Sequence, residues 1–112
     1  MKRVYCTCGV PSGALRGGHA HRGLNQLLVC PAGAVEVFLD DGREKGSVLL
    51  DDPAEGLLVG PMVWHDMRWA EKGSVLSVLA SDYYDEADYI RDYGEFEQEL
   101  GRIVAAREEG LR

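Results

Sequence analysis

The sequence lacks the features that would place it in a membrane or in an oxidising compartment. None of its apolar runs approaches the roughly 20 residues that a membrane-spanning helix requires, and its first ten residues, MKRVYCTCGV, contain no apolar stretch typical of a signal peptide. Its three cysteines, Cys6, Cys8 and Cys30, cannot all pair within the chain. We interpret them as packed thiols rather than as a metal site. These features predict a cytoplasmic protein with no membrane partner.

Basic residues are outnumbered, and they are unevenly distributed. The chain carries 12 Lys and Arg against 19 Asp and Glu, a net charge of −7 that argues against a nucleic-acid partner. Residues 82–112 hold ten acidic and four basic side chains, whereas residues 1–22 hold no acidic residue and four basic ones, namely Lys2, Arg3, Arg16 and Arg22. This local positive charge could hold a small anion such as a diphosphate, or it could be solvated surface charge.

Short apolar stretches punctuated by Gly, Pro and Asp run along most of the 112 residues, a length that suits one domain. Their alternation and near-regular spacing predict an all-β fold, an antiparallel β-sandwich or jelly roll, over about residues 3–81. The expected strands are residues 3–8, 25–30, 34–40, 47–50, 57–59, 63–69 and 74–80. Residues 9–18 contain Pro11 and four glycines and are expected to form a loop.

The C-terminal tail, about residues 85–109, follows a different pattern. Its apolar residues recur mostly at spacings of three, four and seven, which is typical of a helical stripe: Ile90, Phe96, Leu100, Ile103 and Val104. We expect a turn or short helix over residues 85–92 and a longer α-helix over residues 95–108. The narrow stripe would pack on the sandwich or on a partner subunit.

The motif with most chemical potential is centred on His19-Ala20-His21. Because side chains alternate along a strand, the two imidazoles should point to the same face. The surrounding spacing resembles the cupin pattern: Gly13, five residues, His-x-His, four residues, Gln26, six residues and Gly33. A second cupin-like stretch, GLLVGPMVWH, ends at His65.

Gln26 occupies the position where the cupin pattern has a glutamate. An amide is a poorer ligand for a divalent cation than a carboxylate, so we predict that no metal is bound, although His19, His21 and His65 could hold Zn²⁺ or Fe²⁺. Without a metal, the imidazoles remain available as acid and base near neutral pH. Satisfied structural histidines are the alternative.

Several stretches taken together resemble the nucleotide-sugar 3,4-ketoisomerases, which act on dTDP-4-keto-6-deoxyglucose. They are RGGHAHR (16–22), QLLVC (26–30), LDDG (39–42), GPMVWH (60–65) and VLASDYYDEADYIRDY (78–93). The resemblance runs from about Arg3 to about Phe96. It implies an RmlC-like cupin jelly roll, a homodimer and a cofactor-free tautomerisation that moves the ketone from C4 to C3, on the way to deoxyamino sugars of surface polysaccharides. Family members carry a further N-terminal segment, which contributes strands and dimer contacts.

The resemblance also implies roles for individual residues. His19 and His21 fall on the catalytic histidines, while Arg16 and Tyr5 fall on the ligand-facing region. A guanidinium such as Arg16 can bind a diphosphate in bidentate fashion, and Gln26 could bind a sugar hydroxyl or fix a histidine tautomer. The predicted substrate-binding set is completed by Arg22 and His65.

Two other functions stay open. One is a cupin that binds a nucleotide sugar without converting it, and the less favoured one is a small metal-dependent dioxygenase. Conversion of the sugar would exclude the first and metal content would test the second. Trp64 is interpreted mainly as a core residue, and the polar residues between 83 and 88 are expected to cap the barrel end or the helix, without a chemical role.

Overall fold

The computed structural model describes residues 1–110, with side chains through residue 108. No helix within these residues is both long and apolar enough to cross a bilayer. The elements, in chain order, are β1 (Arg3–Thr7), β2 (Leu15–His21), β3 (Gln26–Ala32), β4 (Val35–Asp40), β5 (Lys45–Leu50), β6 (Gly56–Val59), β7 (Trp64–Trp69), β8 (Val75–Ala80), the 3₁₀ helix η1 (Glu86–Asp88), β9 (Tyr89–Ile90) and α1 (Tyr93–Gly110).

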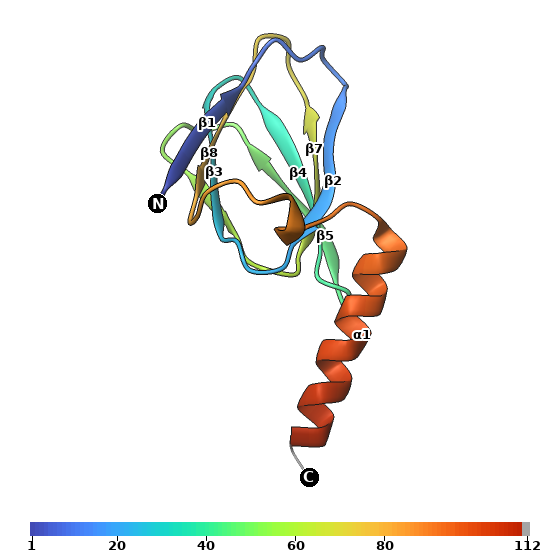
Figure 1. Cartoon of the computed structure of the whole chain (residues 1–112). Coiled ribbons are helices and arrows are strands. Elements are labelled where there is room, and N and C mark those ends of the chain that lie inside the picture. Colours follow the sequence, from blue (N-terminus) through green and yellow to red (C-terminus); the bar gives the residue numbers. More distant parts are fainter. Residues whose placement is uncertain (111–112) are drawn as a thin grey trace.

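The strands form two sheets that face each other (Figure 1). One has the order β1-β8-β3-β6 and the other β5-β4-β7-β2-β9, and each strand pair that the structure defines in residues 1–110 is antiparallel. The predicted all-β antiparallel sandwich with a C-terminal helix is therefore confirmed.

The core lies between the sheets because each sheet turns alternate apolar residues inward. In β4, Val35 and Val37 are fully buried. In β8, the exposed fraction is at most 3% for Leu76, Val78 and Ala80. All of these side chains except that of Ala80 pack with Leu28, Val59 and Trp69 in one cluster. Burial of alternate residues is what a period of two in the sequence dictates.

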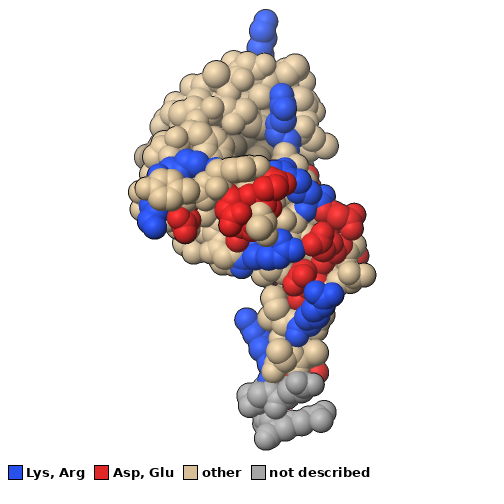
Figure 2. All heavy atoms as spheres, viewed as in Figure 1, with Lys and Arg blue, Asp and Glu red and all other residues tan. Residues whose placement is uncertain are grey.

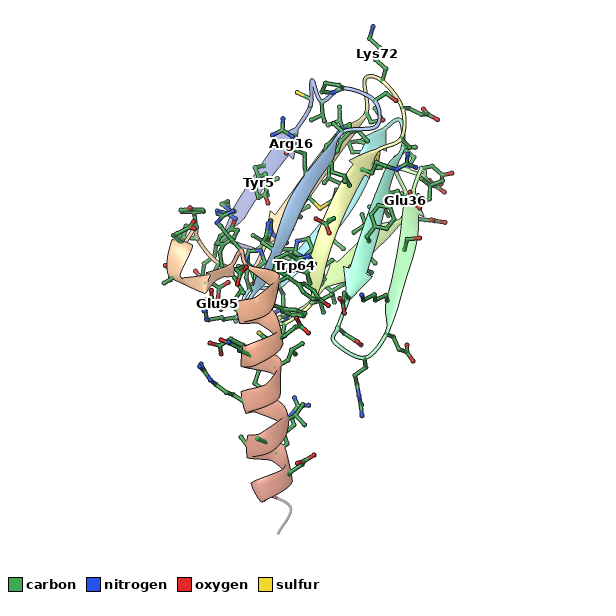
Figure 3. All side chains as sticks on the ribbon, turned by 90° about the vertical axis from the view of Figure 1, so that its right-hand side faces the viewer. Tyr5, Arg16, Glu36, Trp64, Lys72 and Glu95 are labelled. Atoms are coloured by element: carbon green, nitrogen blue, oxygen red, sulfur yellow. The ribbon has the colours of Figure 1, made fainter. Side chains whose placement is uncertain are left out.

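The helix packs on the sandwich only through its first turns. Phe96 is fully buried against Ala20 of β2 and Ile90 of β9, and its ring lies 5.7 Å from the ring of Trp64, near the start of the helix (Figure 3). The C-terminal part of the helix projects away from the sheets (Figure 1), and Val104 is half exposed.

The tail differs in detail from its prediction. The long helix begins at Tyr93 rather than at residue 95 and continues to Gly110. Residues 85–92, expected to be a turn or short helix, contain both a 3₁₀ helix and the two-residue strand β9. Strand β9 pairs with β2 through Ala20↔Ile90 and His21↔Tyr89, a long-range pairing that no local pattern of two residues can signal.

The prediction of a loop over residues 9–18 is wrong at its C-terminal end, because β2 begins at Leu15. Gly17 and Gly18 adopt φ values of 97° and 75°, which favour glycine. The register between β2 and β7 shifts at this point. The two glycines therefore form a β-bulge inside a strand instead of a turn.

Candidate active site

Three histidines meet between the sheets at one end of the sandwich. His19 and His21 lie on β2, and His65 lies on β7, directly opposite His19 in the strand register. The ring centroids are 4.6 Å apart for His19 and His65, 5.1 Å for His19 and His21, and 5.9 Å for His21 and His65. His21 and His65 are each 1% exposed. The structure thus gathers all three histidines of the chain into one cluster.

Two of the imidazoles have an identifiable hydrogen-bond partner. The Nδ1 of His65 lies 3.1 Å from the carbonyl oxygen of Val63, so this nitrogen carries the proton because a carbonyl only accepts. The Nδ1 of His21 lies 3.2 Å from Oδ2 of Asp88. Among the described residues, the buried Nε2 of His21 and Nδ1 of His19 have no partner. Unpaired buried nitrogens are costly, so they are candidates for contact with a ligand.

The environment keeps these rings neutral. Burial, followed by the neighbouring His65 and His21, lowers the pKa of His19 to about 3. Burial and His65 lower the pKa of His21 to about 4, although Asp88 acts in the opposite direction. Burial also lowers the pKa of His65. At neutral pH the cluster therefore offers lone pairs that can accept protons.

Tyr89 of β9 completes the cluster. Its ring centroid lies 4.4 Å from that of His21 and 5.1 Å from that of His19, and the guanidinium of Arg91 lies 4.3 Å from the same centroid. Sequence reasoning gave no role to Tyr89 and only a capping role to Asp88, although both lie within the stretch 78–93 that carries the resemblance. Their proximity to the histidines depends on the pairing of β9 with β2.

The opposite sheet contributes Tyr5 and Gln26. Gln26 is 2% exposed, and its Nε2 donates to the hydroxyl of Tyr5 at 3.4 Å. The guanidinium of Arg3 lies 5.0 Å from the Tyr5 ring centroid. Burial, and then the neighbouring Tyr89, raise the pKa of Tyr5. Polar groups of both sheets therefore face the same end of the sandwich.

Arg16 shares the inner face of β2 with the histidines, and the bulge is the reason. Arg16 is opposite Met67, while His19 is opposite His65, two residues earlier on β7. Residues two apart on a strand share a face, so Arg16 and His19 do as well, although their own spacing is three. Arg16 is exposed (Figure 3) and forms no ion pair with a described residue.

Arg22 is directed to the tail rather than to the histidines. Its guanidinium donates to the carbonyls of Ala87 and Tyr89 at 2.8 and 3.0 Å and to Glu95 at 2.8 Å. Acidic and basic side chains gather where the sandwich meets the first turns of the helix (Figure 2). The predicted substrate-binding role of Arg22 stays a prediction, and the contacts in the structure hold the tail in place.

A cavity of about 240 Å³ lies beside the histidine cluster and shares Asp88 and Tyr89 with it. Its other lining residues include Arg3, Leu24, Tyr83 and Tyr84. The three histidines are not among its lining residues, but aromatic, cationic and acidic groups converge on it, which gives it the mixed character of a small-molecule site.

The histidine cluster offers a divalent metal three nitrogen donors and no negative charge. The ligand atoms of the three histidines lie within 4.8 Å of one another, and these residues are the ones that would hold an ion. All three are neutral, however, and the position of the cupin carboxylate holds Gln26, whose amide nitrogen is turned to Tyr5. No charge in this donor set offsets that of the metal, and the prediction of a metal-free site rests on that chemistry.

An antiparallel sandwich with a His-x-His strand and a third histidine facing it between the sheets defines a cupin. The chain belongs to the family described as "FdtA: WxcM-like, C-terminal", whose model matches residues 1–101. The resemblance to nucleotide-sugar 3,4-ketoisomerases that the motifs predict is thereby confirmed, and so is the enzyme class, an isomerase.

The relatives that match this chain include enzymes named as sugar 3,4-ketoisomerases or 3,4-oxoisomerases. The chain is 47% identical over 108 residues to the TDP-4-oxo-6-deoxy-alpha-D-glucose-3,4-oxoisomerase of Aneurinibacillus thermoaerophilus, covering 96% of this chain and 78% of the relative. The structure of QdtA, a sugar 3,4-ketoisomerase from Thermoanaerobacterium thermosaccharolyticum in complex with TDP, superposes with a TM-score of 0.87 at 44% identity, covering 90% of this chain and 74% of that one.

A histidine-to-asparagine mutant of that enzyme, in complex with TDP-4-keto-6-deoxyglucose, gives a TM-score of 0.85 at 44% identity over 88% of this chain and 71% of its own.

Proposed function

We propose that this protein is a sugar 3,4-ketoisomerase that converts dTDP-4-keto-6-deoxyglucose to a dTDP-3-keto-6-deoxyhexose. The observation that carries the proposal is the cluster of three neutral imidazoles, two of which have buried nitrogens without a partner among residues 1–110. The name of the Aneurinibacillus relative supplies the substrate. The Thermoanaerobacterium enzyme is in complex with TDP in one structure and, as a mutant, with TDP-4-keto-6-deoxyglucose in another.

The reaction needs only proton transfers. A base removes the proton from C3, which leaves an enolate, and the conjugate acid formed in this step protonates the C4 oxygen to give an enediol. A base then takes the proton of the C3 hydroxyl and, as its conjugate acid, delivers a proton to C4. One C–H and one O–H bond break, one of each forms, and no electrons leave the substrate.

His19 and His21 are the groups that we assign to these transfers. Their ring centroids lie 5.1 Å apart, and both rings are neutral, as a base must be at the start. Their low pKa makes each imidazolium a strong acid once it has formed, so the proton is readily returned to the substrate. His65 faces them across the strand pair and can hold the second oxygen.

Substrate binding is assigned to the polar groups around the cluster. Arg16 has an exposed guanidinium on the same face as the histidines and suits a diphosphate. Tyr5 and Gln26 are joined to each other from the opposite sheet and can contact sugar hydroxyls. The proposal uses no metal and no redox cofactor.

The test is incubation with dTDP-4-keto-6-deoxyglucose in D₂O, followed by NMR. Formation of the 3-keto sugar with deuterium at C4 is the expected result, and heat-denatured protein is the control. Tight binding of the nucleotide sugar without conversion would favour the non-catalytic binding protein instead. Conversion that requires added Fe²⁺ or Zn²⁺ would contradict the metal-free mechanism.

A homodimer is part of the same proposal, and the outer face of the four-stranded sheet supports it. A row of apolar residues crosses this face in register: Val4, Leu79, Leu27 and Leu58. Val4 is 64% and Leu58 66% exposed, whereas the solvent face of an antiparallel sheet is ordinarily polar. Because the row is apolar and carries no charge, the same row of a second copy can pack against it across a twofold axis.

Light scattering should therefore give the mass of two chains, and Leu58→Lys should shift the mass toward one chain by placing a charge in the contact. Leu49→Lys is the matched control, because Leu49 is also exposed on a strand but belongs to the other sheet. A monomeric parent protein at micromolar concentration would contradict the dimer.

The cytoplasm is the location we propose. The interpretation of the cysteines as packed thiols holds for the buried Cys30 and is wrong for Cys6 and Cys8, which are exposed. All three are free thiols, which suits a reducing compartment. A maleimide reagent that cannot cross membranes should label Cys6 and Cys8 in lysed cells and leave them unlabelled in intact cells.

A further inference from the structure

The contact between His21 and Asp88 joins the centre of the site to a residue 67 positions away in the sequence. We propose that Asp88 is a positioning residue: it fixes the tautomer of His21 so that Nε2 carries the lone pair that faces the substrate. The catalytic consequence rests on the proposed function. The tautomer itself does not, since it follows from hydrogen-bond geometry.

Each oxygen of the Asp88 carboxylate has one partner. Oδ1 accepts from the backbone N–H of Gly23 at 2.8 Å, and Oδ2 lies 3.2 Å from Nδ1 of His21. An ionised carboxylate can only accept hydrogen bonds, so Nδ1 must be the protonated nitrogen of the neutral ring. The lone pair then resides on Nε2, the buried nitrogen that has no partner among the described residues.

The segment that carries Asp88 is held on both sides by the residue that follows His21. The backbone N–H of Arg22 donates to the carbonyl of Asp88 at 2.9 Å, and its guanidinium donates to the carbonyls of Ala87 and Tyr89 at 2.8 and 3.0 Å. Asp88 is thus fixed relative to His21, because Arg22 follows His21 in the sequence and bonds to Asp88 and to both of its neighbours. This is the support that a precisely oriented base requires.

The carboxylate also distinguishes the two catalytic histidines. Asp88 favours the protonated form of His21, whereas none of the described carboxylates forms an ion pair with His19, whose pKa is lower. The imidazolium that forms when a proton leaves the sugar is therefore better stabilised on His21. The arrangement follows the general logic of a base oriented by a third group.

Asp88→Asn is an informative substitution because it nearly preserves the shape. The N–H of Gly23 can only donate, so it retains the amide oxygen of the new side chain. The amide NH₂ then faces Nδ1 of His21 and donates to it. Nδ1 must become the acceptor, which moves the ring proton to Nε2 and removes the lone pair from the substrate side.

The experiment is ¹⁵N NMR of the imidazoles at neutral pH, combined with kinetics. The chain has only three histidines, and His19→Asn and His21→Asn assign their signals. In the parent protein His21 should be the Nδ1–H tautomer, and in Asp88→Asn the Nε2–H tautomer. His65, which donates from Nδ1 to Val63, should not change and serves as the internal reference.

Turnover should fall about a hundredfold or more in Asp88→Asn, as expected for loss of a general base, while KM stays within about threefold. Asp92→Asn is the matched control. This substitution removes the same charge as Asp88→Asn. Asp92 also accepts a hydrogen bond from a backbone N–H, that of Glu95 at 3.1 Å, but the described contacts do not join it to a histidine. Its turnover should stay within about twofold of the parent.

An Nε2–H tautomer of His21 in the parent protein would overturn the proposal, and this measurement does not depend on whether the variant folds. An unchanged tautomer with unchanged turnover in Asp88→Asn would overturn it as well. A parent protein that shows the expected tautomer but does not convert the keto sugar would contradict the proposed function and leave the tautomer assignment supported.

Discussion

The two ends of strand β7 each contain a buried polar group, and the two groups are treated in opposite ways. Near one end lies His65, within the histidine cluster. At the other end lies Trp69, fully buried, whose indole N–H donates to the carbonyl of Ser74 at 3.0 Å. Ser74 is also fully buried, and its hydroxyl accepts from the N–H of Ala34 at 2.9 Å.

The difference lies in hydrogen-bond satisfaction. At the Ser74 end, the hydroxyl also has the carbonyls of Ala34 and Glu71 within 3.1 and 2.8 Å as acceptors, so the polar groups are paired and hold the loop to the sheet. At the histidine end, two ring nitrogens have no partner among residues 1–110. A paired buried group stabilises the fold, whereas an unpaired one is a cost that is retained where a substrate completes the pairing.

The largest effect is expected from His19→Asn and His21→Asn. Loss of a general acid–base group typically lowers the rate by roughly 10²–10⁴, so at least one variant should lose about a hundredfold or more in turnover. Its melting temperature and its affinity for the nucleotide sugar should stay close to those of the parent. Kinetics, calorimetry and a binding assay measure the three quantities. Normal turnover in both variants would contradict a catalytic role for the histidine end of β7.

Ser74→Ala should have the reverse profile. It leaves the buried N–H of Ala34 without its acceptor, which should lower the free energy of unfolding by about 1–3 kcal/mol, while turnover well below the melting temperature is unchanged. Urea denaturation measures the loss. Ser12→Ala is the control, because Ser12 is exposed and its hydroxyl makes only a 3.4 Å contact; its effect should lie within about 0.5 kcal/mol.

Lowering the pH should destabilise the protein through the histidine end of β7 and not through the Ser74 end. The pKa of His21 falls from 6.5 to about 4 on folding, so between these pH values the unfolded chain binds a proton that the native chain does not. Stability therefore declines as pH falls through this window. Urea midpoints at several pH values should show this decline in the parent and in Ser74→Ala, and a smaller one in His21→Asn. Equal slopes in all three would contradict it.

The same shift should appear in activity. Because the bases are neutral well below pH 6.5, the acid limb of kcat/KM should lie near pH 4 rather than near 6.5. A pH–rate profile with a stable buffer series measures it. A limb at about pH 6.5 would mean that the histidines are solvated in the active protein.

The smallest effect is expected from removing metal. Dialysis against a chelator should leave turnover unchanged, and elemental analysis of protein purified without chelator should find no stoichiometric transition metal. The reason is the neutral donor set, with Gln26 at the carboxylate position. About one Zn or Fe per chain would show that the unpaired nitrogens serve a metal instead of a substrate.

The sequence was sufficient to predict the features that depend on local periodicity. The alternation of residues 34–40 predicted a strand because every second side chain enters the core, as Val35 and Val37 do. The stripe of the tail predicted a helix that packs through Phe96. The spacing of His19 and His21 predicted that the two rings lie together, and their centroids are 5.1 Å apart.

The rest depended on contacts between distant residues. Asp88 and Tyr89 reach the histidines only because β9 pairs with β2, and two residues are too few to show a period. The glycines at 17 and 18 contributed to the prediction of a loop over residues 9–18, but the sheet uses them as a bulge. The partner of Arg22 lies in the tail, and sequence spacing could not distinguish it from a bound anion.

The bulge at Gly17 and Gly18 also makes the number of residues in β2 matter as much as their identity. It reverses which residues face inward, so that Arg16 shares a face with His19 and His21 at an odd spacing. A natural variant that lacks one of these glycines would keep Arg16 and both histidines in its sequence. Without the extra residue of the bulge, however, Arg16 and the two histidines would lie on opposite faces of the strand. Surveys of such sequences should therefore count the glycines between the arginine and the first histidine, because motif identity alone would overlook an inactivated site.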